Sequence, residues 1–375
     1  MPKTTNGLSV KEMLDNHYSW QEIVDNMEFN RTLYKSNGYP NIPYIMSCGC
    51  KYIVIFGGRG TGKTYGMFDY LTHTVKEKFI YLRRTTAALE TCKDAEFNPF
   101  QPINNDFGDN IYPFSSKDKL FFQKCNEEGE PLDDSVVATG VALSQGGKLR
   151  GFSGEAYNWL YFDEIIKEPL ENARKGEGTA FLNFRETCNR NREQKGLPPI
   201  RCILTGNTDT LDSDILLAID AIDIIERMKK TKQEVYINQE TGLAIFDLWD
   251  SPIAAIKKEI SSPSKRHNRY NDMAFNNDFQ DLKNDYTVKS IPLKKCVPWF
   301  SVNETLYLYN IKGSSEVYVT YHKSGTFNIN LNTSVKDDLL KYDTLYRRTI
   351  YIKMLTNNMF YQSYGAKIYM KENLR

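Results

Sequence analysis

The pattern of hydrophobic and polar positions predicts short buried strands separated by helices. Tyr52–Phe56 is an apolar run rich in β-branched residues that ends at two glycines, as expected of a strand buried on both faces of a parallel sheet. Further runs of this kind are found at 79–82, 136–143, 159–162 and 202–204. Helical spacing lies between several of them, for example over 65–78. The alternation predicts an α/β fold with a mostly parallel sheet.

Four other segments depart from this alternation. Apolar residues at helical spacing in 8–35 predict one or two helices ahead of the first strand. Residues 108–131 contain two short apolar runs around a lysine-bearing turn, which predicts a hairpin. Residues 215–228 are helical in pattern. Residues 261–285 are polar and rich in Ser, Asn and Asp, which is typical of a linker.

The last part of the chain has a different pattern. Antiparallel strands are predicted where apolar and polar positions alternate between glycines, at 305–311, 316–321 and 326–331. Helices are predicted at 339–355 and 360–370. These elements favour a small α+β domain at the end of the chain.

The 375 residues therefore predict two domains. We expect a larger domain over 1–254 with an N-terminal helical extension, a linker over 255–285 and a small domain over 286–375. No stretch approaches 18 consecutive apolar residues, which predicts no membrane span. Residues 1–10 lack the apolar core of a signal peptide.

The glycine-rich segment after the first strand matches a complete phosphate-binding loop. It reads GGRGTGKT, the GxxxxGK[ST] pattern, and comprises Gly57, Gly58, Arg59, Gly60, Thr61, Gly62, Lys63 and Thr64. Glycines let successive backbone N–H groups converge on phosphate oxygens, and the following helix adds its dipole. We expect Lys63 to reach the β- and γ-phosphates and Thr64 to ligate Mg²⁺, so ATP and Mg²⁺ are the predicted cofactors.

Two acids follow the strand at 159–162. Asp163 is predicted to hold the hydration shell of Mg²⁺, and Glu164 to position and deprotonate an attacking water. An acidic pair after a strand is common in proteins. The complete phosphate loop earlier in the chain favours a functional interpretation, because the two motifs together form a hydrolytic site. The second carboxylate favours an ATPase motor or helicase over a kinase of small molecules.

A third core strand ends in Thr205, Gly206 and Asn207. Asn207 is predicted to lie beside the γ-phosphate, where it could sense phosphate loss and couple it to motion. Gly-Asn is also ordinary turn chemistry, so a simple strand-end turn stays open as the alternative.

Phosphoryl transfer also needs positive charge on the transition state. Arg59 inside the loop could supply it within its own site. Other candidates lie on connections that could face a neighbouring subunit, namely Lys148, Arg150, Arg190 and Arg192. A solvated surface charge is the alternative for each of them.

The order of these motifs resembles a known family. GGRGTGKT, YLRRT, LRGFS, WLYFDE, RNR and ILTGN follow one another within residues 45–210. This order is similar to that of the viral DNA-packaging ATPases, which are the terminase large subunits and, most similar of all, the compact encapsidation proteins of small tailed bacteriophages. The resemblance implies a P-loop ATPase domain of the additional-strand, RecA- and terminase-like type. It also implies an ATP-driven translocase that packages double-stranded DNA into a prohead.

The resemblance carries roles to individual residues. Asp163 and Glu164 become the metal-shell acid and the catalytic glutamate, and Asn207 falls in the coupling motif. Basic residues that act in trans map by spacing onto Arg150 and Arg190. A lysine is usual at the first of these positions, and Arg192 is a rival for the second.

The resemblance also implies partners and a location. These are double-stranded DNA, a homo-oligomeric ring with five subunits, the phage portal and prohead, and no membrane. The site of action would be the host cell cytoplasm and, transiently, the portal vertex of the prohead. A DNA helicase or recombination ATPase of related fold stays open as the alternative, and a scaffold that uses ATP only as structural glue is disfavoured by Glu164.

The C-terminal domain of the family is RNase H-like, and in large terminases it is a nuclease with clustered carboxylates. Here the strand that should carry an aspartate reads VYVTYH from Val317 and has none, so we expect a vestigial domain without nuclease activity. Residues 286–375 hold 13 basic and six acidic side chains, a net charge of +7, whereas residues 1–285 have −6. The basic, tyrosine-rich domain suits a nucleic-acid backbone, and a basic surface with tyrosines in the core stays open as the alternative. The resemblance to the compact group implies that a structural RNA is as good a candidate as DNA.

The turn of the predicted hairpin carries two lysines. Lys117 and Lys119 are candidates for gripping DNA in the channel of a ring, through phosphates rather than base edges. A solvated turn is the alternative for both.

Overall fold

The computed structural model describes residues 3–116, 119–145, 152, 154–166, 176–208, 210–261, 279 and 285–374. The chain divides into two compact units that are each discontinuous in sequence. The first unit comprises Met1–Leu211 and Met228–Gln280, and the second comprises Asp212–Arg227 and Asp281–Arg375. None of the described helices combines the length and the apolar character that crossing a membrane would require.

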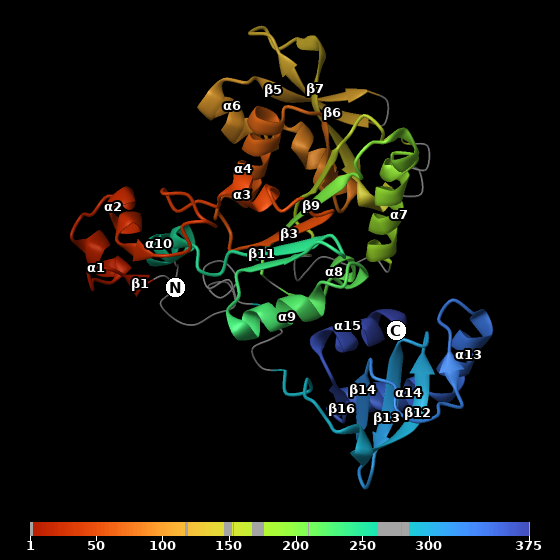
Figure 1. Ribbon diagram of the computed structural model, residues 1–375. Coiled ribbons are helices and arrows are strands. Elements are labelled where there is room, and N and C mark those ends of the chain that lie inside the picture. The colour runs from red at the N-terminus through yellow and green to blue at the C-terminus, as the bar shows by residue number, and fades with distance from the viewer. Residues whose placement is uncertain are drawn as a thin grey trace. The chain divides into compact units, whose positions relative to one another are not determined.

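The first unit is built on one large sheet (Figure 1). Its strands are β3 (Tyr52–Phe56), β4 (Phe79–Arg83), β5 (Ile111–Ser116), β6 (Lys119–Cys125), β7 (Pro131–Ala142), β8 (Trp159–Phe162), β9 (Arg201–Gly206), β10 (Val235–Asn238) and β11 (Leu243–Asp247). The strand order is β10-β11-β3-β9-β8-β4-β7-β6-β5. The pairs from β11 to β7 are parallel, and β10, β6 and β5 add antiparallel pairs at the two ends. The predicted α/β class with a mostly parallel sheet is confirmed.

Strand β9 is inserted between the loop-bearing β3 and the acid-bearing β8. This is the additional strand of the predicted fold type, and it brings the ends of the three motif-bearing strands side by side. The registers Ile53↔Ile203 and Tyr161↔Ile203 hold the strands level. Since all three are parallel, their carboxyl ends meet at one edge of the sheet.

All five strands predicted from apolar runs are present in this sheet, and so is the hairpin, formed by β5 and β6. The hairpin tip at 117–118 lies outside the described residues. The edge pair β10–β11 was not predicted, although β11 is entirely buried. Its five-residue run LAIFD is short and has no polar alternation, so its role as a strand depends on parallel pairing with β3.

Helices cover both faces of the sheet. In the first unit they are α1 (Val10–Asp15), α2 (Trp20–Asp25), α3 (Ile42–Met46), α4 (Lys63–Asp69), α5 (Thr86–Glu90), α6 (Gln101–Phe107), α7 (Glu177–Asn189) and α10 (Pro252–Ser261). Figure 1 shows α4 and α6 on one side of the sheet and α7 on the other. The helix expected at 65–78 is α4 followed by a π-helical segment, η1 (Tyr70–Val75).

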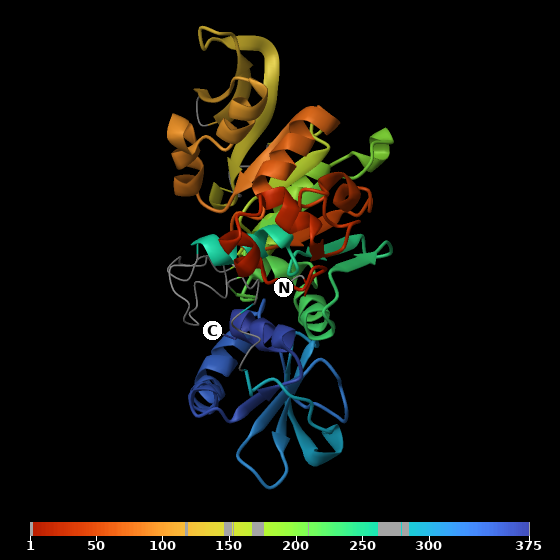
Figure 2. The same cartoon turned by 90° about the vertical axis from the view of Figure 1, so that its left-hand side faces the viewer.

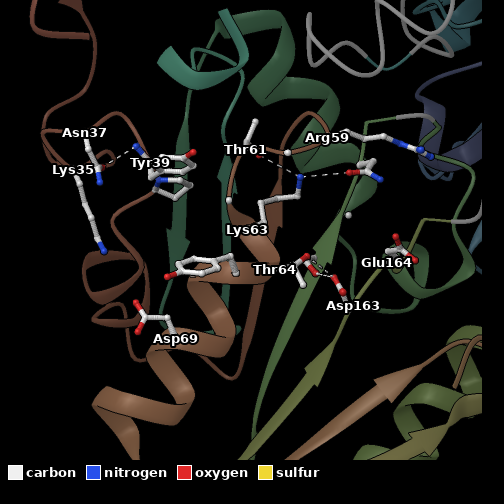
Figure 3. Close-up of a pocket in the computed structure, with 18 of the residues that line it drawn as sticks. Lys35, Asn37, Tyr39, Arg59, Thr61, Lys63, Thr64, Asp69, Asp163 and Glu164 are labelled. Atoms are coloured by element: carbon white, nitrogen blue, oxygen red, sulfur yellow. Dashed lines mark hydrogen bonds between the residues drawn. The ribbon is translucent and has the colours of Figure 1, made fainter. Parts of the chain in front are cut away.

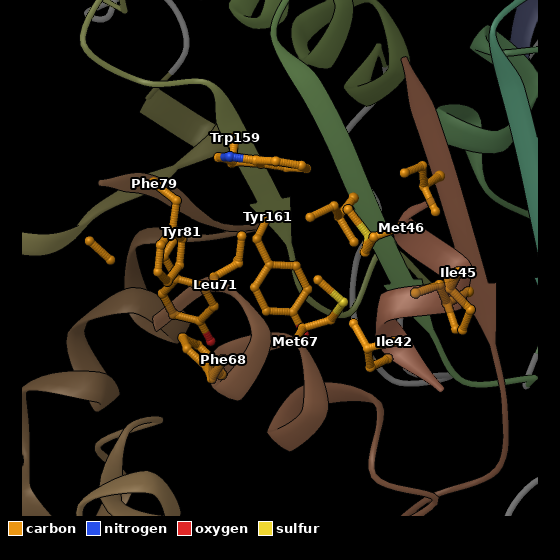
Figure 4. Packing of buried hydrophobic residues seen from close by; sticks show 14 of the residues in the cluster. Ile42, Ile45, Met46, Met67, Phe68, Leu71, Phe79, Tyr81, Trp159 and Tyr161 are labelled. Atoms are coloured by element: carbon orange, nitrogen blue, oxygen red, sulfur yellow. The ribbon is translucent and has the colours of Figure 1, made fainter. Parts of the chain in front are cut away.

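The core of the first unit is rich in aromatic residues (Figure 4). Phe68 of α4 makes edge contacts with Tyr81 of β4 and Tyr161 of β8, with ring centroids 5.3 and 5.5 Å apart. It also packs against Phe100, at 4.6 Å. These contacts fix the helix that follows the phosphate loop against the two strands beside it.

The N-terminal segment forms its own small cluster. The short strands β1 (Lys3–Thr4) and β2 (Met27–Glu28) pair, and α1 and α2 each begin with a capping box, at Ser9 and Ser19. Met13 and Ile23 pack against Ala255 and Ile256 of α10. Residues 255–261, where we expected the linker to begin, are therefore helical, because their apolar face is covered by the N-terminal helices.

The second unit has a five-stranded sheet of order β15-β12-β13-β14-β16. Its elements are α8 (Asp214–Ala218), β12 (Cys296–Val302), β13 (Leu306–Ile311), β14 (Val317–Thr320), β15 (Asn330–Leu331), α13 (Lys336–Leu345), α14 (Arg347–Leu355), β16 (Met359–Tyr361) and α15 (Tyr364–Asn373). β13 and β14 are antiparallel, as predicted. β12, which pairs antiparallel with β13, was not predicted. The antiparallel strand expected at 326–331 is only the two-residue β15, and it pairs with β12 in parallel, as β16 does with β14.

Two predictions for this part of the chain need correction. The helix expected at 360–370 begins only at Tyr364, because Phe360 lies in β16 and pairs with Tyr318, and Ser363 caps the helix. The helix expected at 215–228 is two helices, α8 and α9 (Ile222–Thr231). Residues 212–227 belong to the second unit, where Asp223 and Glu226 accept hydrogen bonds from the first backbone N–H groups of α15.

Candidate nucleotide-binding site

The motifs predicted from the sequence converge on one cavity of about 730 Å³ in the first unit. The phosphate loop follows β3, the acidic pair follows β8 and Asn207 follows β9. Residues of all three motifs line the cavity, and Figure 3 shows them around the start of α4. Their meeting follows from the parallel strands, which end at the same edge of the sheet.

Lys63 is the first residue of α4 and only 7% exposed. Its Nζ donates to the carbonyl oxygens of Gly57 and Gly58 at 2.7 and 2.8 Å, and Asn207 Oδ1 lies 3.4 Å away. Burial lowers the pKa of Lys63 to about 8, although Asp163 and Glu164 act in the opposite direction. The ammonium group is therefore held inside the loop, close to where phosphate oxygens would bind.

Asp163 is the most heavily hydrogen-bonded carboxylate of the site. Its Oδ1 accepts from Thr205 at 2.7 Å, Tyr161 at 3.0 Å and Thr64 at 3.3 Å. Burial and the neighbouring carboxylate raise the pKa of Tyr161 well above its usual value, so its hydroxyl stays protonated and donates. Three donors on one oxygen fix the orientation of the carboxylate toward Thr64.

Glu164 is held by an arginine from the neighbouring strand. Arg83, the last residue of β4, donates to Glu164 Oε2 at 2.8 Å and lies 3.4 Å from Asp163 Oδ2. Burial disfavours the charge of Arg83, but Tyr81 and the two acids outweigh it and raise its pKa. Glu164 also has φ +62, a left-handed conformation that costs a non-glycine residue about 1 kcal/mol or more. Residues in such conformations are often found at functional sites, which agrees with the prediction for Glu164 without testing it.

These residues fit a magnesium nucleotide. Thr64 Oγ1 and Asp163 Oδ1 are 3.3 Å apart, so two oxygen ligands of the kind Mg²⁺ prefers face the same point. Gly60 and Gly62 have φ +69 and +88, which turns their backbone toward the cavity in a conformation that favours glycine. The cavity volume is in the range of small-molecule sites.

The remaining loop residues have structural or lining positions. Thr61 is fully buried, and its hydroxyl donates to the carbonyl of Gly58 at 2.9 Å, which closes the loop on itself. Arg59 lines the cavity (Figure 3). The expected role of Arg59, to supply positive charge within its own site, stays a prediction.

The candidate trans-acting arginines differ from one another. Arg190 is exposed at the end of α7, before β9 begins, and thus at the opposite end of β9 from Asn207. Arg192 is fully buried and donates to the carbonyl oxygens of Pro198, Tyr157 and Glu155. Arg192 therefore stabilises the surrounding loops by these hydrogen bonds. Because it is buried, it is less suited than Arg190 to act on a neighbouring subunit. Lys148 and Arg150 lie outside the described residues.

Of the two lysines proposed to grip DNA, Lys119 is the first residue of β6 and is exposed. Lys117 lies outside the described residues. Figure 2 shows the hairpin strands β5 and β6, next to the long β7, at one end of the first unit's sheet.

Sequence reasoning missed the role of Arg83, although YLRRT was among the motifs it singled out. The signal was present, since a charged residue at the carboxyl end of a parallel strand faces the same edge as the other motifs. It also missed Tyr161, which sits in an apolar run and was counted only as core. Lys257 of α10, whose Nζ donates to the carbonyl of Gly60 at 2.6 Å, carried no sequence signal.

A comparison with known families identifies the family of this chain. The family model "Podovirus DNA encapsidation protein (Gp16)" matches residues 35–279, which is more than half of the chain and includes every motif above. The chain belongs to the podovirus DNA encapsidation protein family. The predicted resemblance to the compact encapsidation group is thereby confirmed, and family membership assigns this encapsidation protein to viral DNA packaging.

Solved structures share the fold of this encapsidation protein. The DNA packaging motor gp11 of phage Phi-28 matches with a TM-score of 0.59 at 18% identity, over 89% of this chain and 97% of that one. The genome packaging motor assembly of bacteriophage Phi-29 matches with a TM-score of 0.57 at 16% identity, over 90% and 99%. A comparison with curated protein sequences finds no match. At these identities the structural likeness supports the fold alone.

Proposed function

We propose that this encapsidation protein is an ATP hydrolase that drives double-stranded DNA into a phage prohead. The observation that carries the proposal is the convergence of Lys63, Thr64, Asp163 and Glu164 on one cavity at the ends of adjacent parallel strands. Lysine, metal ligand, metal-shell acid and catalytic carboxylate are the set that ATP hydrolysis requires.

Each residue has a distinct task in the proposed reaction. The loop N–H groups and Lys63 would bind the β- and γ-phosphates, and Thr64 and Asp163 would hold Mg²⁺, which when bound neutralises charge developing on the phosphates. Glu164 would orient the attacking water and accept its proton. Asn207, within 3.4 Å of Lys63 Nζ, would report the state of the γ-phosphate to β9.

We further propose that the protein works as a homo-oligomeric ring, in which the family resemblance implies five subunits. Arg190 supports this, because it is exposed and precedes β9, whereas Asn207 and the nucleotide cavity lie at the other end of that strand. The nucleotide of a neighbouring subunit is therefore its proposed target. Arg150 is proposed for the same role by its spacing. An arginine supplied in trans stabilises the transition-state charge of phosphoryl transfer.

Nucleic acid and prohead are the proposed partners. Lys119, with Lys117, would contact duplex phosphates, and the +7 charge of residues 286–375 would bind DNA or a structural RNA. We propose that this C-terminal part has no nuclease activity, since Val317–Thr320 carries no aspartate. The protein would act in the host cytoplasm and, during packaging, at the portal vertex.

DNA-stimulated phosphate release tests the enzymatic proposal. Glu164→Gln should abolish hydrolysis and retain ATP binding, because the amide keeps the size of the side chain and removes the base. Lys63→Ala should lose binding as well. Equal hydrolysis by Glu164→Gln and the unchanged protein would contradict the assigned role.

A packaging reaction with purified proheads, ATP and DNA tests the proposed translocation of DNA. We expect DNA to become resistant to nuclease inside the prohead with the unchanged protein and not with Glu164→Gln. If the protein instead separates the strands of forked DNA and packages none, it is a helicase and the translocase proposal is wrong.

A further inference from the structure

The nucleotide cavity has a second wall that the phosphate-binding motifs do not explain. Lys35, Asn37 and Tyr39 line the cavity although they precede the first core strand. Figure 3 shows them grouped on one side of Lys63, with Asp163 and Glu164 on the other. A triphosphate whose terminal phosphate faces the acids would therefore extend its nucleoside toward this wall.

The wall is a tight turn held by its own backbone. Gly38 N–H donates to the carbonyl of Lys35 at 2.9 Å, and Lys35 N–H donates to the carbonyl of Tyr39 at 2.8 Å. The backbone N–H of Tyr39 also donates to Asn37 Oδ1 at 3.3 Å. The turn is thus formed in advance and presents its side chains without further ordering.

The turn is also anchored from behind. Gly38 has φ +82, and a Cβ there would lie 3.1 Å from Pro252 Cβ of α10. A glycine is needed because the backbone both adopts a left-handed conformation and approaches α10 closely. Because Lys257 of α10 also donates to the carbonyl of Gly60 in the phosphate loop, α10 contacts both the turn and the loop.

Tyr39 lies directly against the phosphate loop. A Cβ on Gly62, the residue before α4, would come within 2.6 Å of Tyr39 Cδ1. The tyrosine nevertheless remains 38% exposed and lines the cavity. An aromatic ring that is fixed on one side by a glycine and open to a cavity on the other is suited to stack on a planar ligand.

We propose that Tyr39 is the base-stacking residue of the nucleotide site, with the turn 35–39 forming its nucleoside wall. The inference rests on the proposed ATP site and adds the residue that binds its base. Stacking of a nucleobase on an aromatic side chain contributes about one to two powers of ten to affinity. The ring rather than the hydroxyl makes this contact, so phenylalanine serves as well as tyrosine.

A comparison of two ligands tests the proposal directly. Mg·ADP carries a base, whereas magnesium tripolyphosphate offers phosphates without one, and both are titrated calorimetrically into the full chain. Tyr39→Ala should weaken ADP binding roughly 10-fold or more and leave tripolyphosphate binding within about 2-fold. Tyr39→Phe should bind both ligands as the unchanged protein does.

The outcomes separate this inference from the proposed function. If Tyr39→Ala weakens both ligands equally, or neither, Tyr39 does not stack on the base and the inference is overturned. Lys63→Ala is the matched control and should weaken both ligands. If the unchanged protein binds neither ligand, or Lys63→Ala binds both normally, the nucleotide site itself is wrong. Equal melting temperatures of the two Tyr39 variants exclude a loss of folding as the cause.

Discussion

Single buried side chains decide the geometry of the candidate site. Asp163 takes three hydrogen bonds on one oxygen, from Thr64, Tyr161 and Thr205, and so its position is set by three strands or loops at once. Hydrogen bonds to a charged acceptor are among the stronger ones, contributing about 1.5 to 3 kcal/mol each. A carboxylate held in this way needs little reorganisation when a metal binds, which is a general feature of preorganised sites.

Two neighbouring arginines should behave in opposite ways when they are replaced. Arg192→Ala should destabilise the protein by about 3 kcal/mol or more, because it removes a fully buried guanidinium together with its hydrogen bonds to the carbonyl oxygens of Pro198, Tyr157 and Glu155. Arg190→Ala should change the free energy of unfolding by less than about 0.5 kcal/mol, since its side chain is exposed. Urea denaturation measures both values.

Activity distinguishes the same pair. In the proposed ring, Arg190→Ala should lose ATP hydrolysis and regain part of it when mixed with Lys63→Ala subunits, because each variant supplies what the other lacks. Absence of complementation in the mixture would remove the support for action in trans.

A lysine should not replace Arg192 in stabilising the fold. Arg192→Lys is not expected to restore even part of the stability lost in Arg192→Ala, since one ammonium cannot reach the three carbonyls.

At the scale of elements, close approaches of backbone explain glycines that no motif requires. Gly154 lies ahead of β8, and a Cβ there would be 2.4 Å from Cys188 Cα and 2.7 Å from its carbonyl oxygen, in the last turn of α7. Neither atom belongs to a side chain that could move aside. The close approach of the last turn of α7 to the segment that leads into β8 therefore depends on this glycine.

Gly154→Ala should destabilise the first unit by about 2 to 3 kcal/mol, as overpacking against backbone does. Gly66→Ala is the matched control, because its Cβ would meet only the Ile42 side chain, at 2.9 Å, and the change gains helix propensity of about 1 kcal/mol. Thermal unfolding in the absence of nucleotide compares the two. Similar losses of stability in both variants would show that the close approach to α7 has no special weight.

The helix after the phosphate loop shows how an element can be predicted and still differ in detail. Helical spacing predicted 65–78, and the structure continues α4 as a π-helix from Tyr70 to Val75. His73 in that segment lies between Asp69 and Asp109, at 2.8 and 2.6 Å. Tyr65 of α4 donates to Asp106 of α6 at 2.6 Å. These bonds tie the helix to α6, and a periodicity in apolar positions carries no information about them.

At the scale of the whole molecule, the second unit takes in a segment from far upstream. Asp223 and Glu226 accept hydrogen bonds from Gly365 and Tyr364 at 2.9 Å each, and Asp212 pairs with Lys371. Burial raises the pKa of Asp223, although the hydrogen bonds from Ser363 and Gly365 act against this. The folding unit at the end of the chain is therefore larger than residues 286–375.

Gly365→Ala should loosen this second unit, because a Cβ there would lie 2.2 Å from Asp223 Oδ1. Hydrogen exchange followed by mass spectrometry should become faster in 212–227 and 359–373 and remain unchanged in β3, β8 and β9. Adding Asp223→Ala should relieve part of the effect, as expected of two residues in contact. Unchanged exchange in 212–227 would contradict the assignment of this segment to the second unit.

Charge is also distributed at the scale of the molecule. The total of +1 conceals −6 over residues 1–285 and +7 over residues 286–375. Lys294 and Lys295 are exposed before β12, and Lys312 Nζ lies next to them, bonded to the carbonyl of Lys294 at 3.0 Å. Such a cluster suits phosphate groups, whichever nucleic acid supplies them.

Replacing Lys294 and Lys295 with glutamine should weaken binding to duplex DNA or RNA and reduce the dependence on salt. The slope of log affinity against log salt should fall by about 2 if both lysines contact phosphates. Titrations between low and moderate salt measure the slope, and Lys230→Gln, in the first unit, is the control. An unchanged slope would place the nucleic-acid contacts elsewhere.

The sequence alone was sufficient to predict those features that depend on residues adjacent in the chain. GGRGTGKT, the acids after β8 and the apolar strand runs each depend on adjacent residues, so the loop, Asp163, Glu164 and the α/β class followed directly from reading the chain. The proximity of the motifs to one another also followed, because parallel strands bring their carboxyl ends to one edge. Arg83 could have been added by the same rule.

Tertiary structure alone decided the features that join distant residues. The order of β9 between β3 and β8, the pairing of Arg83 with Glu164 and the burial of Arg192 beside an exposed Arg190 have no local signature. The same holds for the turn 35–39 against Gly62 and for 212–227 beside α15. A sequence pattern records which residues prefer burial or a given backbone, but the partner of each buried or charged group is chosen only when the whole chain packs.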